Sequence, residues 1–289
     1  MRIIFALLIF LVFSGVSSAV ELTIGLIPEQ NVFKQMQRYR PMGEYIEKKT
    51  GIKIRFTILS RYGNIISSFE SEKMDGAFWG SFTGGLAINQ LEIKPIARPV
   101  WLDDTSTYHG YIFVRKESGI KNVADMKGKT IAFVEKATTA GYVFPMAYLK
   151  ENGVKDIDSY FKEYYFAGSH DATILAVLDK EADIGCAKNT IFNVVSNKDP
   201  RVEKDLVILA QSPVVPSNGL SIRKDLDPVI QKKLLDVLLK MERDPEGKET
   251  LKKFGAKRFI KTTVDDYRPV FDIARKAGID LKRYQYINK

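Results

Sequence analysis

The feature that most constrains the fold is a regular alternation of short apolar segments with longer segments of helical periodicity. In the first third of the chain, apolar segments of strand length occur at 22–28, 52–59, 75–80 and 93–101. Segments with helical spacing of their apolar residues lie between them, at 32–50, 62–73 and 81–91. Parallel strands need a long crossover connection, which a helix supplies. This order therefore predicts an α/β fold with a mainly parallel sheet covered by helices.

A second α/β series follows a long strand that we expect at 107–116. Its strands are predicted at 128–134, 164–168, 182–188 and 206–212, and its helices at 140–151, 171–180 and 190–197. After a further strand at 219–224, the C-terminal residues are predicted to be helical over 226–243, 247–254 and 264–277. No low-complexity linker separates the two series. We therefore expect two lobes joined by extended strands, with a hinge and a cleft between them.

The expected domain boundaries follow from these two series. We assign 1–19 to a signal peptide, 20–107 to the first part of lobe 1, 108–210 to lobe 2 and 211–289 to the second part of lobe 1 with the C-terminal helices. The hinge crossings are expected near Tyr108–Tyr111 and Leu209–Ser212.

The N-terminal residues have the pattern of a secretory signal peptide. Arg2 precedes an apolar run over 3–13, and Ser17, Ser18 and Ala19 form a small-residue cleavage site. We expect cleavage near Ala19 and export to the periplasm, with an uncleaved N-terminal anchor as the alternative. The chain has one cysteine, Cys186, so it forms no internal disulfide, and we expect that side chain to be a small buried hydrophobe.

The charge of the chain excludes one class of partner. The formal net charge is +9, yet the basic residues are scattered along the sequence without interleaved aromatic residues. Nucleic-acid binding is therefore not expected. A basic protein of this kind suits a small anionic ligand, and we expect it to be a monomer.

A turn between a strand and a helix is the first candidate binding element. Thr138, Thr139, Ala140 and Gly141 follow the strand at 128–134 and precede a helix. The first backbone N–H groups of a helix lack intrahelical partners and lie at the positive end of the helix dipole. Small residues leave those amides accessible, and two hydroxyls add donors, which suits an oxyanion. The alternative is that Thr138 or Thr139 only caps the helix.

Two further junctions have the same character. Ser81 lies in a glycine-rich junction that opens the helix at 81–91, and His170 directly precedes the helix at 171–180. A histidine there is favoured in its neutral form by the positive helix end, and it still offers an N–H donor. Because ligands bind at the carboxyl ends of strands in open α/β sheets, the three junctions together predict a ligand site.

Enzymatic chemistry is not expected. Ser169, His170 and Asp171 are adjacent in sequence, whereas the members of a catalytic triad converge from separate segments. The only other histidine is His109, so no histidine-rich metal site is available. We expect no cofactor and no metal, and a hydrolase is kept only as a minor alternative.

Six segments in a fixed order carry a family resemblance. They are SRYGNIISSF, MDGAFWGSFTG, YIFVRKESGIKNVADMKGKTIAFV, TTAGYVFP, GSHDATILAVLDKEADIG and SPVVPSNGLSIRKDL. With these segments the chain resembles the substrate-binding proteins of ABC transporters for phosphonate, phosphite and phosphate. The resemblance implies the type 2 periplasmic-binding-protein fold, in which two α/β lobes joined by hinge strands enclose a ligand cleft. It also implies a small oxyanion ligand and transient delivery to an ABC transporter permease.

The resemblance assigns ligand contacts to individual residues. Thr138, Thr139 and Ala140 match the anion-binding turn, and His170 matches the histidine of the next helix start. Tyr62 matches a tyrosine after the second strand, and Trp79 stands where the family has another aromatic residue. We add Ser81 from its junction and Tyr108 from its place at the hinge.

Two departures from the family pattern bear on the ligand. Members that bind aminoalkylphosphonates have acidic residues at the positions that Thr190 and Asn218 occupy here. An ammonium group would find no counter-charge at either position, and the nearby Lys188 adds positive charge if it faces the cleft. We therefore expect a ligand without an amino group. A separate membrane sensor or chemoreceptor, in place of a permease, is the alternative partner.

Overall fold

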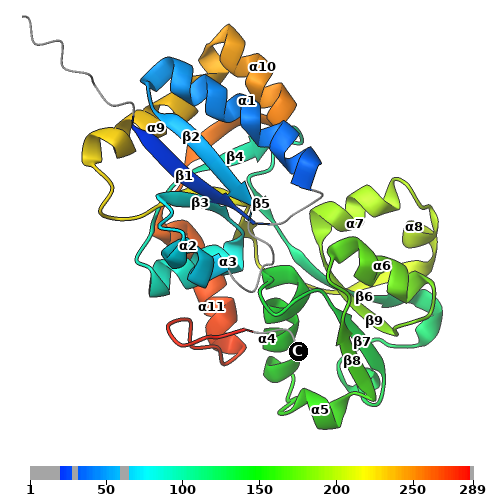
Figure 1. Cartoon of the computed structure of the whole chain (residues 1–289). Helices are drawn as coiled ribbons and strands as arrows, with labels where there is room; N and C mark the ends of the chain where they lie inside the picture. Colours follow the sequence, from blue (N-terminus) through cyan, green and yellow to red (C-terminus); the bar gives the residue numbers. More distant parts are fainter. Residues whose placement is uncertain (1–19, 28–31, 59–64, 287–289) are drawn as a thin grey trace, which may run out of the picture.

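The computed structural model describes residues 20–27, 32–58 and 65–286, and Figure 1 shows them as two lobes. The predicted signal peptide lies outside these residues. Each lobe contains one large sheet. A third sheet of two strands is formed by the segments that lead from one large sheet to the other. Within the described residues no helix combines the length and the apolar character needed to cross a lipid bilayer.

Lobe 1 is built on a six-stranded sheet with the order β13-β4-β12-β3-β1-β2. Its strands are β1 (Glu21–Leu26), β2 (Lys53–Ile58), β3 (Gly76–Trp79), β4 (Lys94–Trp101), β12 (Gly219–Ile222) and β13 (Ala256–Lys261). The strand β1 pairs in parallel with β2 and β3, whereas β12 runs antiparallel to β3 and β4. Strands from both ends of the chain thus share one sheet.

Lobe 2 repeats this topology with five strands in the order β10-β6-β9-β7-β8. The strands are β6 (Gly110–Arg115), β7 (Thr130–Phe133), β8 (Glu163–Phe166), β9 (Ile184–Lys188) and β10 (Leu206–Gln211). Here β7 pairs in parallel with β8 and β9, and β6 runs antiparallel to β9 and β10. The order therefore matches β4-β12-β3-β1-β2 of lobe 1 strand for strand, although the two sequences show no obvious repeat.

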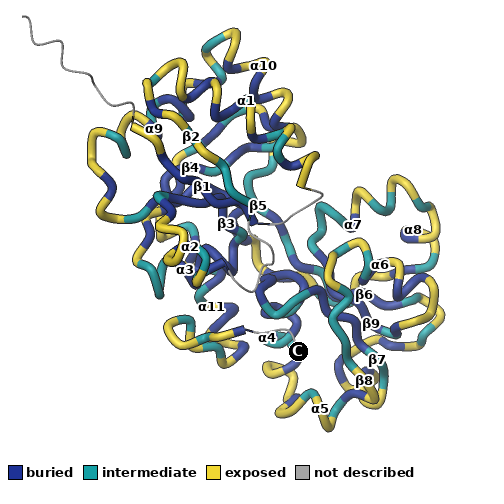
Figure 2. The backbone as a smooth tube through the Cα atoms, in the orientation of Figure 1, coloured by how far each residue is buried: buried dark blue, intermediate teal, exposed yellow. Residues whose placement is uncertain are grey.

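Helices cover both faces of each sheet, and their outer faces are exposed (Figure 2). Those of lobe 1 are α1 (Val32–Thr50), α2 (Ile65–Ser71), α3 (Ser81–Gln90), α9 (Pro228–Lys240), α10 (Pro245–Phe254) and α11 (Arg268–Lys276). Those of lobe 2 are α4 (Phe144–Glu151), α5 (Ile157–Tyr160), α6 (His170–Leu178), α7 (Asn189–Ser196) and α8 (Arg201–Asp205). In lobe 1, α1, α9 and α10 pack on one face of the sheet, and α2, α3 and α11 lie on the other (Figure 1).

The chain crosses between the lobes at a break in a segment that we predicted to be one strand. Residues 107–116 form two strands instead, β5 (Thr107–Tyr108) and β6, which belong to different sheets. The break falls at His109, whose backbone N–H donates to Asn189 Oδ1 at 3.0 Å rather than to a sheet neighbour. The strand β5 pairs with β11 (Val215–Pro216), which lies on the returning crossing. The two crossings are therefore held side by side.

One strand was missed between the helices predicted at 247–254 and 264–277. The strand β13 follows α10, which ends at Gly255 in the left-handed conformation, and it pairs antiparallel with β4 at the edge of the sheet. Its register shifts between Ala256 and Arg258, so its buried residues do not alternate regularly. Because this period-two signal is broken, the sequence pattern did not reveal the strand. Cys186, by contrast, is buried as predicted.

Candidate functional site

A cavity of about 230 Å³ lies between the two lobes. It is lined by seven of the residues predicted to bind the ligand, namely Ser81, Tyr108, Thr138, Thr139, Ala140, His170 and Asn218. The volume suits a small ligand, since cavities for drug-sized molecules begin at about 300 Å³. Donors from both lobes therefore converge on a space of the size of a small ion.

The turn after β7 owes its shape to a glycine. Gly141 O accepts a hydrogen bond from the backbone N–H of Val134 at 3.1 Å, which folds the turn back onto the end of the strand. A Cβ atom on Gly141 would lie only 2.4 Å from the Val134 Cβ. Any larger residue at this position would therefore push the turn away from the strand. Thr139–Val143 forms a single π-helical turn that leads into α4.

This helix start presents unpaired amides to the cavity. The N-cap residue Thr138 makes no side-chain capping bond, and its hydroxyl donates backwards to Glu135 O at 2.6 Å. In a π-helix the backbone N–H of a residue bonds the carbonyl five positions earlier, so the amides of its first turn have no intrahelical acceptor. The turn that holds Thr139 and Ala140 therefore offers backbone donors as well as a hydroxyl.

A chain of hydroxyl groups joins the lobes at the cavity. Ser81 Oγ lies 2.6 Å from Thr139 Oγ1 of lobe 2 and is also hydrogen-bonded to the hydroxyl of Tyr108. Ser81 begins α3, whose N-cap Gly80 makes no side-chain bond to the helix. The first residues of α3 line the same cavity as the turn of lobe 2. An oxyanion can accept hydrogen bonds from both helix starts at once.

His170 is a neutral donor held in one tautomer. The helix α6 is capped by Ser169, whose hydroxyl accepts from Ala172 N–H, so His170 is not needed as a cap. Its Nδ1 accepts a hydrogen bond from the backbone N–H of Lys188 at 3.2 Å. Burial and the nearby Lys188 lower the pKa of His170 to about 3. At neutral pH the ring is therefore uncharged and carries its proton on Nε2.

Two cationic side chains line the cavity. The Lys188 ammonium lies 4.3 Å from the centre of the Tyr108 ring. Arg38 reaches the cavity from α1, donates to Phe254 O at 2.7 Å and stacks over the rings of Trp101 and Phe254. Arg38 was not predicted, because it is one of many dispersed basic residues and no motif marks it. Among the described residues that line the cavity there is no carboxylate.

Two of the predicted site residues lie outside the cavity lining, and a third is not among the described residues. The Trp79 side chain is fully buried in an apolar cluster with Phe69 and does not line the cavity. Thr190 also lies outside the lining, between Lys188 and Ile191, which both belong to it. Tyr62 lies outside the described residues. In the parts of the chain that the structure describes, no cluster of histidine, cysteine or acidic residues could hold a metal.

Comparisons with known proteins agree with this geometry. The family described as "ABC transporter, phosphonate, periplasmic substrate-binding protein" matches residues 24–267. The phosphonates-binding periplasmic protein of Escherichia coli K12 is 26% identical over 239 residues, which span 81% of this chain and 70% of that protein. A Prochlorococcus marinus protein named as a probable ABC transporter phosphite binding protein is 24% identical over 285 residues, 93% of this chain and 94% of its own length.

The architecture also matches that of a solved structure. A Prochlorococcus marinus protein in complex with methylphosphonate has a TM-score of 0.74 at 22% identity, and the match covers 90% of this chain and 99% of that one. The two chains therefore share the same two-lobed fold.

Proposed function

The chain belongs to the family of periplasmic substrate-binding proteins of phosphonate ABC transporters, and we propose that its ligand is a phosphorus oxyanion without an amino group. The fold is the type 2 periplasmic-binding-protein fold, as the resemblance implied. Phosphate, phosphite and simple alkylphosphonates meet the requirement. The observation that carries the proposal is the lining of the cavity of about 230 Å³. Hydroxyls, helix-start amides and cations line it, and there is no carboxylate among its described lining residues.

The lack of a carboxylate among the described lining residues matters because a charge taken out of water needs a partner. The ammonium group of an aminoalkylphosphonate would be placed near Lys188 or Arg38 without a compensating acid among the described lining residues. Asn218 and Thr190 stand where the resemblance expects acidic residues in members that bind aminoalkylphosphonates, which also favours a ligand without an amino group. Asn218 is buried and lines the cavity, where its amide can donate to an oxyanion.

We infer a delivery cycle from the position of the cavity between the lobes. The ligand joins the helix start at Ser81 in lobe 1 to the turn at Thr139 in lobe 2, and contacts to both lobes favour the closed form. The closed protein then presents its rims to a transporter permease in a transient complex. Export through the predicted signal peptide, cleaved near Ala19, places this cycle in the periplasm, with the protein as a non-catalytic monomer.

Calorimetry on ligand-free protein tests the proposal. Phosphate, phosphite, methylphosphonate and 2-aminoethylphosphonate are titrated into the wild type, Ser81→Ala and Thr139→Ala. We expect tight binding of an amine-free anion that each variant weakens by about 10-fold, as for loss of a hydrogen bond to a charged group. The variant Ser159→Ala is the control, because that hydroxyl bonds Asp156 on the exposed surface of lobe 2. Preference for the aminophosphonate would overturn the proposed ligand class.

A further inference from the structure

We propose that Lys188 selects the charge of the ligand, so that the site favours a doubly ionised oxyanion over a singly ionised one of the same shape. This inference rests on the proposed function and goes beyond it, because it assigns charge discrimination to one residue. A formal positive charge close to the ligand adds an attraction that grows with the charge of the ligand, so it favours the dianion over the monoanion.

Lys188 is held where it can act on the ligand. It is the last residue of β9, and its backbone N–H donates to His170 Nδ1, which fixes its main chain beside the anion-binding histidine. Its ammonium rests on the face of the Tyr108 ring, 4.3 Å from the centre, and the Tyr108 hydroxyl bonds Ser81. Lys188 also lines the cavity, so its charge lies close to an anion bound there.

The other groups that lobe 2 places around the cavity do not duplicate this charge. His170 is uncharged at neutral pH, since its pKa is lowered to about 3. The Arg38 guanidinium also lines the cavity, but its Nε donates to Phe254 O and its plane stacks on Trp101 and Phe254 of lobe 1. Asp171, which follows His170 in sequence, accepts a hydrogen bond from the Ser169 hydroxyl and does not line the cavity. Lys188 is therefore the cation that lobe 2 contributes to the lining.

Methylphosphonate and methanesulfonate provide a matched pair of probes. Both carry one methyl group and three oxygens, but at about pH 8.5 the phosphonate is mainly a dianion whereas the sulfonate has a single charge. Their affinities are measured by calorimetry on wild type, Lys188→Met, Lys188→Arg and Lys198→Met. Lys198 is an exposed lysine of the same lobe, so its removal changes the net charge equally without touching the cavity. Thermal melting verifies that each variant is folded.

We expect the wild type to prefer methylphosphonate, and Lys188→Met to lose about 10- to 100-fold in affinity for it while methanesulfonate changes less than 3-fold. Lys188→Arg and Lys198→Met should keep the preference. An equal loss for both probes in Lys188→Met would overturn the inference, as would the same loss in Lys198→Met, yet both outcomes leave the proposed function standing. Binding of no phosphorus oxyanion by the wild type would remove the proposed function and this inference together.

Discussion

At the scale of single residues, the protonation state of His170 is fixed by its surroundings. The His170 ring accepts a proton only at about pH 3, because burial and Lys188 disfavour the imidazolium. Its free Nε2–H is set by the bond from Lys188 N–H to Nδ1. The site therefore has the same pattern of donors across the whole neutral range, whatever the ionisation of its ligand.

The lowered pKa of His170 predicts a measurable effect on stability. In the unfolded chain the imidazole gains its proton near pH 6.5, whereas in the folded protein it remains neutral down to about pH 3. The unfolded state thus binds more protons in this window, so the free energy of unfolding falls as the pH falls from about 6.5. The slope from this group is at most about 1.4 kcal/mol per pH unit.

The measurement compares chemical unfolding of ligand-free wild type and His170→Gln at several pH values between 7 and 4.5. The carboxylates titrate in both proteins, so their contribution cancels in the difference. We expect the wild type to lose stability more steeply than the variant on acidification. Parallel curves would mean that His170 is protonated as easily in the folded protein as in the unfolded chain.

Trp79 offers a second prediction about a single side chain. Its indole N–H is buried and has no hydrogen-bond partner among the described residues, and the ring packs on Phe69. The variant Trp79→Phe removes an unpaired donor, a gain of about 1–3 kcal/mol that offsets the loss of packing volume. We expect the free energy of unfolding to change by less than about 1.5 kcal/mol, as measured in urea.

Calorimetry on Trp79→Phe also tests the ligand contact that the family resemblance assigned to Trp79. Affinity within 3-fold of the wild type is expected from the position of the ring outside the cavity lining. A 10-fold loss of affinity at unchanged stability would show instead that the indole reaches the ligand in the bound form.

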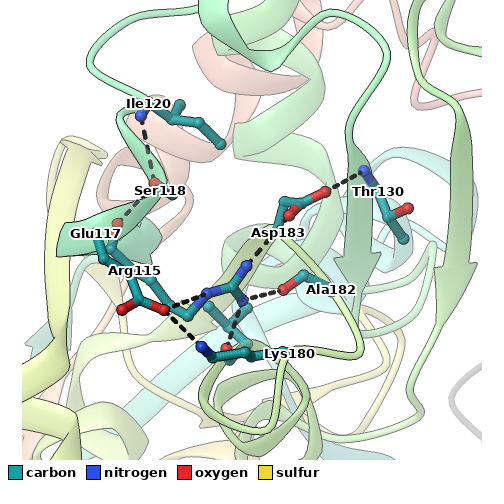
Figure 3. A network of polar contacts seen from close by, with 9 residues as sticks. Arg115, Glu117, Ser118, Ile120, Thr130, Lys180, Ala182 and Asp183 are labelled. Atoms are coloured by element: carbon teal, nitrogen blue, oxygen red, sulfur yellow. Dashed lines mark hydrogen bonds and ion pairs between the residues drawn. The ribbon is translucent and has the colours of Figure 1, made fainter.

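At the scale of secondary-structure elements, the central strands of both lobes are linked by the same arrangement of an aspartate and an arginine. In lobe 2, Asp183 at the start of β9 accepts from Thr130 N–H at the start of β7 and pairs with Arg115 of β6 (Figure 3). In lobe 1, Asp75 accepts from Thr23 N–H of β1 and pairs with Arg223, which follows β12. In each sheet an aspartate thus links three strands, and these strands have equivalent positions in the two sheets. The link lies at the end of the sheet away from the cavity.

The two aspartate–arginine pairs are expected to contribute different amounts to the free energy of unfolding. The Arg115 side chain is 12% exposed and also donates to the backbone oxygens of Val177 and Ala182 at 2.7 and 2.6 Å. Arg223 is 39% exposed. Removal of Arg115 takes its donors away from the buried carbonyls of Val177 and Ala182, and Val177 O keeps only a long bond from Lys180 N–H at 3.4 Å, so Arg115→Met should cost about 2–4 kcal/mol of unfolding free energy. Arg223→Met should cost about 1 kcal/mol or less.

Urea unfolding of both variants provides the comparison, and ligand affinity serves as a second readout. Neither arginine lines the cavity, so the affinity of each folded variant should stay near the wild-type value. Equal losses of stability in the two variants would show that burial and the carbonyl bonds of Arg115 add nothing to the ion pair.

Elements with a clear periodicity were predictable from the sequence, whereas connections and edges were not. The helix α1 begins and ends at the predicted residues 32 and 50, because its apolar stripe is long and regular. The strand β13 was missed because a register shift breaks its alternation. Of the site, the helix starts at Ser81, Thr139 and His170 were predictable from small and hydroxylated residues after apolar strands. Arg38 was not, because only tertiary packing brings α1 to the cavity.

At the scale of the whole molecule, the C-terminal residues connect the two lobes a third time. The helix α11 packs on α3 of lobe 1 and α4 of lobe 2, next to each other in Figure 1. Beyond it, Leu281 O accepts from Gln90 Nε2 of α3 at 2.6 Å, while the Tyr284 hydroxyl donates to Lys136 O of lobe 2 at 3.3 Å. One apolar cluster includes residues of α3, α4 and α11 together.

Tyr284 is the residue through which we expect this segment to influence closure. Its ring packs edge-on against Phe82 of α3 at 5.4 Å between centres, and its hydroxyl reaches lobe 2. If these contacts exist only when the lobes are closed, Tyr284→Ala shifts the ligand-free protein towards the open form. The ligand must then supply more of the closing energy, so affinity should fall about 3- to 10-fold, although Tyr284 does not line the cavity.

Small-angle scattering and calorimetry test this on Tyr284→Ala, with Lys276→Met as the matched control. Lys276, the last residue of α11, pairs with Glu151 of α4 at 2.7 Å, but both side chains are about half exposed, so this pair should contribute little. We expect a larger radius of gyration for ligand-free Tyr284→Ala and a wild-type value once ligand is bound. If Tyr284→Ala loses only thermal stability, with an unchanged radius of gyration and unchanged ligand affinity, the C-terminal segment takes no part in opening and closing. Its contacts with both lobes would then persist through opening, and closure would be governed by the crossings at β5 and β11 alone.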